Sequence, residues 1–72
     1  MINHKEDSKR IGRNLKKLRL KKGLTQMEIA LDTNLSETYI SRIETGKARI
    51  TFSLLGQLCK GLKIHSSELI EF

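Results

Sequence analysis

The sequence predicts an all-α fold: a compact five-helix bundle with two short helices and a tight turn at its centre. The chain of 72 residues has no proline and only 4% aromatic residues, which favours helices over sheet. Apolar residues recur at spacings of three and four, and residues that cap helices stand between the apolar segments. A chain of this length forms a single domain with a thin core.

The first helix is expected over residues 8–22. Asp7 or Ser8 can cap its amino end, and Gly23 can end it, with Leu24 packing behind the glycine. The helical spacing rests on its apolar positions Ile11, Leu15 and Leu18.

The next two helices are expected over residues 25–32 and 36–44. Thr25 and Glu28 have the spacing of a capping box, in which each side chain accepts a hydrogen bond from the backbone of the other residue. Asn34, a residue that tolerates the left-handed conformation, stands where the chain must turn. Two further boundary residues are the cap Ser36 and the closing glycine Gly46. The segment is therefore expected to form a helix-turn-helix.

A fourth helix is expected from its cap Thr51, and a final turn or two from Ser66. The apolar positions of the fourth helix are Phe52, Leu55, Leu58, Cys59 and Leu62. Residues 1–7 are polar and aperiodic, so we expect them to form a flexible N-terminal arm. Residues 8–72 are expected to form the domain.

The pattern Gly-Leu-Thr-Gln-x-Glu-Ile-Ala begins at Gly23, and Asn-Leu-Ser-x-x-Tyr-Ile-Ser-x-Ile-Glu-x-Gly-Lys begins at Asn34. Together they resemble the DNA-binding domain of the phage repressor and Cro family (XRE-like), which includes restriction-modification controller proteins. Flanking apolar patterns extend the resemblance over residues 8–70. It implies a lambda-repressor-like DNA-binding domain.

The resemblance also implies roles for single residues. The family pairs an arginine on the first helix with the glutamate that ends the third, here Arg19 and Glu44; the alternative is two surface charges that never meet. Arg19 falls on the inward side of its helix, where an unpaired charge is costly. Gln26 stands where the family contacts a phosphate. Cys59 replaces a usual alanine and is expected to be a small buried residue; the alternative is a reactive or metal-binding thiol. Lys63 replaces a C-cap glycine, so the helix exit there is expected to differ.

The surface that reads DNA is expected on the helix over residues 36–44. At about 100° per residue, its apolar positions and Glu44 share one side, which leaves the other side to enter the major groove. Arg42 is suited to guanine and Thr38 to the methyl group of thymine, while Glu37 either accepts from cytosine or only complements the helix dipole. The expected base contacts are Glu37, Thr38, Ser41 and Arg42.

Phosphate contacts are expected around this helix, from Gln26, Ser36, Tyr39, Lys47 and Arg49. Three of these residues have alternative interpretations. Tyr39 can instead fill part of the core, and Lys47 and Arg49 can form a merely solvated loop. For the lysines of the first helix, a solvated face is the preferred interpretation: Lys16, Lys17, Lys21 and Lys22.

The net charge of +6 and the isoelectric point near 9.8 suit a nucleic-acid partner, although residues 23–46 are themselves net negative. The one cysteine excludes an internal disulfide, and no apolar run suggests a membrane span or a signal peptide, so a cytoplasmic protein is expected. His4 and His65 have no partners at metal-ligand spacing with Cys59. We therefore expect no metal, no cofactor, no small-molecule ligand and no enzymatic activity.

These features predict a transcriptional regulator that binds a two-fold symmetric operator in double-stranded DNA as a homodimer, because one short helix reads few base pairs. Regulation by its own concentration is expected, as the resemblance implies. The alternative is an antitoxin or anti-regulator whose main partner is another protein. A small bundle cannot easily bury every apolar residue near the end of the chain, so a dimer interface is expected to contain Leu54, Ile64, Ile70 and Phe72.

Overall fold

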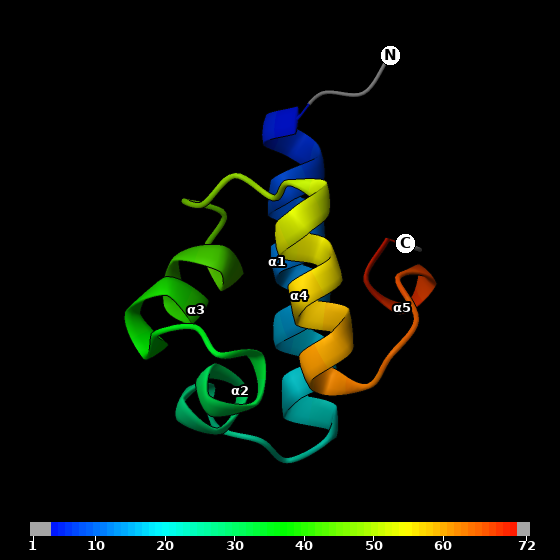
Figure 1. The fold of residues 1–72 in the computed structure, drawn as a ribbon. Helices are drawn as coiled ribbons and strands as arrows, with labels where there is room; N and C mark the ends of the chain where they lie inside the picture. Colours follow the sequence, from blue (N-terminus) through cyan, green and yellow to red (C-terminus); the bar gives the residue numbers. More distant parts are fainter. Residues whose placement is uncertain (1–3, 71–72) are drawn as a thin grey trace.

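The computed structural model describes residues 4–70 and confirms the all-α prediction: within this range the chain forms five helices and no strand (Figure 1). In chain order these helices are α1 His4–Lys21, α2 Gln26–Thr33, α3 Glu37–Glu44, α4 Phe52–Leu62 and α5 Ser67–Ile70. The central pair, α2 and α3, begins and ends within one residue of the predicted bounds.

One hydrophobic core joins all five helices. Each helix contributes at least one fully buried side chain, and these are Leu15, Ile29, Ile40, Ile43, Leu58 and Leu69. Helix α1 packs against α3 and α5, while α2 packs against α3 and α4. The side-chain amide of Asn14 on α1 also donates to the carbonyl oxygen of Leu69, 2.7 Å away, and so ties the short α5 to the bundle.

Two glycines allow helices to approach closely. A side chain on Gly12 of α1 would overlap the carbonyl oxygen of Ile43 on α3. A Cβ on Gly61 of α4 would lie 2.5 Å from the carbonyl oxygen of Asp32 on α2. Helix α3 is therefore held against α1 by backbone contact as well as by its side chains.

The segments after α1, α2, α3 and α4 turn in the same way, through one residue in the left-handed conformation: Gly23, Asn34, Gly46 and Lys63. After α4, the N–H of Ile64 donates to the carbonyl of Cys59, as the N–H of Leu35 does to that of Ala30 after α2. The prediction that the exit at Lys63 differs is therefore wrong. The lysine adopts the geometry of a glycine cap because the apolar residue that follows must return to the core.

The beginning of α1 differs from the prediction. The helix starts at His4, so the last four residues of the arm predicted over residues 1–7 are helical. Acidic residues in the first turn suit the positive end of the helix dipole. Ser8, one of the two predicted caps, is buried, and its hydroxyl oxygen accepts a hydrogen bond of 2.9 Å from the backbone N–H of Ile50.

For two apolar residues of α4, the exposure to solvent is the opposite of the one predicted. Phe52, one of the apolar positions of the predicted helix, is 93% exposed, and the contacts of α4 with α2 lie further along the helix, at Gln57 and Gly61. Leu54, predicted at a dimer interface, is only 7% exposed and belongs to the core. The single bundle buries Leu54 itself, so the reason for placing this residue at an interface does not hold.

Substitutions at two glycines, Gly12 and Gly56, test whether α1 and α3 lie in close backbone contact. Gly12→Ala should destabilise the fold by about 1–3 kcal/mol, because the new methyl group collides with the Ile43 carbonyl. Gly56→Ala, in an exposed part of α4 where a Cβ meets nothing, should instead stabilise it by about 0.5–1 kcal/mol. Urea unfolding of both variants measures the difference. Equal effects would mean that α1 and α3 are not in backbone contact.

Candidate nucleic-acid interface

Helix α3 has one buried and one exposed side, as predicted. Its Ser36 cap accepts a hydrogen bond from the N–H of Tyr39, which fixes where the helix begins. The buried side consists of Ile40, Ile43 and Glu44. Of the predicted base-contact residues, Glu37, Thr38 and Arg42 are exposed and Ser41 is half-buried. The exposed side is a short polar surface on a helix that the core holds in place.

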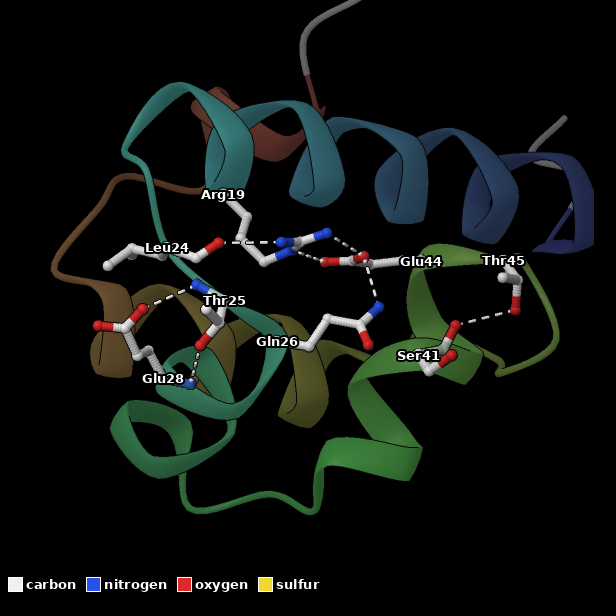
Figure 2. Close-up of polar contacts among 8 residues, drawn as sticks. All are labelled: Arg19, Leu24, Thr25, Gln26, Glu28, Ser41, Glu44 and Thr45. Atoms are coloured by element: carbon white, nitrogen blue, oxygen red, sulfur yellow. Dashed lines mark hydrogen bonds and ion pairs between the residues drawn. The ribbon is translucent and has the colours of Figure 1, made fainter.

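A buried ion pair joins α1 to α3 (Figure 2). Arg19 Nε lies 2.7 Å from Glu44 Oε2, and Arg19 Nη2 lies 3.1 Å from Glu44 Oε1, so two parallel hydrogen bonds form. The third nitrogen of the guanidinium donates to the carbonyl oxygen of Leu24 at 2.9 Å. Both residues are less than one-tenth exposed. The predicted pairing is confirmed, and it also fixes the turn that leads into α2.

The same carboxylate holds Gln26, the first residue of α2. Its side-chain amide nitrogen donates to Glu44 Oε1 at 3.0 Å (Figure 2). That nitrogen was expected to contact phosphate, but in the free protein it is engaged inside the fold. Helix geometry leaves the backbone N–H groups at the start of α2 without intrahelical partners. The capping box of Thr25 and Glu28, with bonds of 2.8 and 3.1 Å, fixes the direction in which they point.

The loop that follows α3 is fixed at several points. The N–H groups of Gly46 and Lys47 donate to carbonyls in the last turn of α3, Ala48 is buried, and the N–H of Ile50 donates to Ser8. Lys47 and Arg49 stand on either side of Ala48 and are exposed. The two predicted phosphate-binding cations are thus held outward by an ordered loop.

Arg42 is linked to this loop. Its guanidinium donates to the carbonyl oxygen of Lys47 at 3.1 Å. This contact spans five residues and depends on the path of the loop, so helix periodicity alone gave no sign of it. An exposed hydrogen bond of this kind contributes on the order of 1 kcal/mol, so the guanidinium can exchange the carbonyl for a base edge. The side chain predicted to read a base therefore also helps to position the loop that carries Lys47.

Tyr39 and Cys59 both pack against the core while remaining partly exposed. For Tyr39 this is the predicted alternative to a phosphate contact. Burial, with a smaller effect of the nearby Glu68 carboxylate, raises the pKa of the Cys59 thiol, which keeps it protonated at neutral pH. Within the described range, no three side chains of the metal-binding types come together, and no helix is long and apolar enough to cross a membrane.

Comparison with known proteins agrees with this geometry. The helix-turn-helix family model matches residues 15–69. The chain belongs to the helix-turn-helix family. The family resemblance predicted from the sequence is confirmed, and with it the assignment to DNA-binding transcriptional regulators rather than to enzymes.

Its relatives include two curated proteins and a solved structure of similar length. This helix-turn-helix protein is 43% identical over 61 residues to the control protein C.MunI of a Mycoplasma species, covering 83% of this chain and 82% of the relative. It is 36% identical over 62 residues to the HTH-type transcriptional regulator y4dJ of Sinorhizobium fredii, covering 86% and 80%. The restriction-modification controller protein C.AhdI from Aeromonas hydrophila superposes with a TM-score of 0.81 at 30% identity, covering 89% of this chain and 97% of that chain.

The ion pair predicts a large coupling between α1 and α3 of this helix-turn-helix protein. Arg19→Ala or Glu44→Ala should each cost about 3–5 kcal/mol of stability, because each leaves one buried charge without its partner. The double variant should cost clearly less than the sum. Denaturant unfolding of the wild type, the two single variants and the double variant measures this coupling. Additive losses of stability would contradict it.

Proposed function

We propose that this protein is a sequence-specific transcriptional regulator that binds a two-fold symmetric operator as a homodimer, with α3 in the major groove. The observation that carries the proposal is the exposed polar side of α3, held by the Arg19–Glu44 pair between the start of α2 and the loop that carries Lys47. In helix-turn-helix proteins the second helix of the motif enters the major groove and its first residues meet base edges.

In this proposal the exposed side of α3 reads the operator. Arg42 donates two hydrogen bonds to a guanine, and Thr38 offers its methyl group to a thymine. Glu37 either accepts from a cytosine or only complements the dipole of α3. Ser41, which is half-buried, completes the surface.

Phosphates are held on both sides of the reading surface. On one side are the backbone N–H groups at the start of α2, where an anion is favoured by the helix dipole, and Gln26 adds its side chain if it releases Glu44. On the other side are Lys47 and Arg49. The hydroxyl of Ser36 caps α3, so its predicted phosphate contact is secondary to that role.

Self-association is supported by apolar side chains that the single chain leaves uncovered. Ile70 is 41% exposed, Ile64 is partly buried against the core, and the predicted Phe72 lies outside the described residues. We add Phe52 to this set, because a phenylalanine that is 93% exposed on a regular helix gains most from a second chain. Two copies would present α3 to successive major grooves about 34 Å apart.

The dimer proposal predicts that Phe52→Ser and Ile70→Ser weaken self-association at least about tenfold each, since each side chain loses buried apolar area. Sedimentation at micromolar concentration measures this shift toward monomer. Leu31→Ser is the matched control, because Leu31 is 77% exposed on α2 and belongs to no proposed interface. A wild-type protein that remains monomeric over this range would remove the homodimer from the proposal.

The proposed reading role predicts that Arg42→Ala lowers operator affinity by about 1–3 kcal/mol per half-site and relaxes preference at one base pair in each half. Lys47→Ala should weaken binding to operator and to scrambled DNA alike. It should also lower the salt slope, which is the fall of log affinity with log salt concentration, by about one per subunit. Titrations on both DNAs at two salt concentrations separate the two roles. If Arg42→Ala weakens both DNAs equally and keeps every base preference, Arg42 acts only through the loop or a phosphate.

A further inference from the structure

The amino-terminal half of α1 lies against the loop that carries Lys47. Ser8 accepts a hydrogen bond from the N–H of Ile50 at 2.9 Å. The stem of Lys9 covers Gly46, with its Cγ only 2.7 Å from the point where a Cβ on the glycine would sit. The next turn of α1 touches the end of α3 at Gly12. In Figures 1 and 2 the loop after α3 passes close to this end of α1.

This part of α1 carries positive charge that the fold does not neutralise. Arg10 is held by Asp7 at 2.7 Å. Lys9 and Arg13 are exposed and have no acidic partner within residues 4–70. They are four residues apart and therefore lie on the same side of the helix. Together with Glu6 and Arg10 they surround an open crevice of about 230 Å³.

We infer that Lys9 and Arg13 bind the DNA backbone next to the phosphate held by Lys47, so that the phosphate-binding surface continues from the loop onto α1. This inference rests on the proposed DNA-binding function. The stem of Lys9 lies against Gly46, the residue before Lys47 in the chain, and both lysines are exposed, so the two can reach neighbouring phosphates of one DNA backbone. Arg13 follows one turn further along α1 and extends the same positive surface.

The packing of its stem distinguishes Lys9 from a merely solvated lysine. A solvated lysine needs no packed stem, whereas the stem of Lys9 packs against a glycine that leaves room for it. A packed stem loses less conformational freedom when its ammonium group binds a phosphate. The same contact gives Gly46 a second role besides ending α3, since any side chain there would displace Lys9.

The test compares two double variants with the same change in net charge. Lys9→Gln with Arg13→Gln removes the inferred contacts and keeps the Lys9 stem on Gly46. Lys60→Gln with Lys63→Gln removes two exposed charges at the end of α4 away from the loop. The full chain is titrated with a random-sequence duplex of about 30 base pairs, enough for two half-sites one helical turn apart.

Binding by the Lys9 and Arg13 variant should have a salt slope lower by about two per subunit. Between about 50 and 200 mM salt, wild-type affinity should therefore fall about tenfold more than that of the variant for each bound subunit, or about a hundredfold more for a dimer. The Lys60 and Lys63 variant should keep the wild-type slope. Equal slopes for both variants would overturn the inference and leave the proposed function intact, whereas a wild-type protein that binds no DNA would overturn the proposed function itself. Arg13→Gln alone, which touches no loop contact, should lower the slope by about one if the double variant is poorly folded.

Discussion

The buried pair of Arg19 and Glu44 is the interaction on which the rest of the structure depends. Burying two charges is tolerated only when their hydrogen-bonding groups are satisfied. Here the guanidinium reaches Glu44 and the carbonyl of Leu24, and the carboxylate accepts from Gln26 as well. One ion pair thus fixes the end of α1, the start of α2 and the end of α3. A shift of α3 along α1 would break the hydrogen bonds to Glu44 together, so the pair sets the orientation of the surface that we propose to read DNA.

Close backbone contact supports the same arrangement in a chain too small for a large core. Gly12 lets α3 lie directly on α1, and Gly61 does the same for α2 and α4. The left-handed exits after the four longer helices each bring the following residues back toward the bundle. At Lys63 this geometry is kept without glycine, which shows that the return of Ile64 to the core outweighs the cost of a left-handed lysine.

The candidate interface combines a rigid helix with a loop that is nearly as well fixed. Lys47 is held by its own backbone bonds, by Arg42 and by the neighbouring contact of Ile50 with Ser8. A preorganised cation loses little freedom when it meets a phosphate, so binding energy is not spent on ordering the loop. The proposed base reading by Arg42 and the proposed phosphate binding by Lys47 are consequently linked through one hydrogen bond.

Local chemistry in the sequence determined the helices, the caps of the helix-turn-helix and the family. The capping box at Thr25, the left-handed Asn34 and the inward Arg19 each follow from a residue type at a fixed spacing, and the family pattern supplied the partner of Arg19. Only the tertiary structure decided that Phe52 is exposed and Leu54 buried, because periodicity gives the face of a helix but not how far its neighbours cover it. It alone placed Lys9 on Gly46, since contacts between residues distant in the chain depend on how the helices pack.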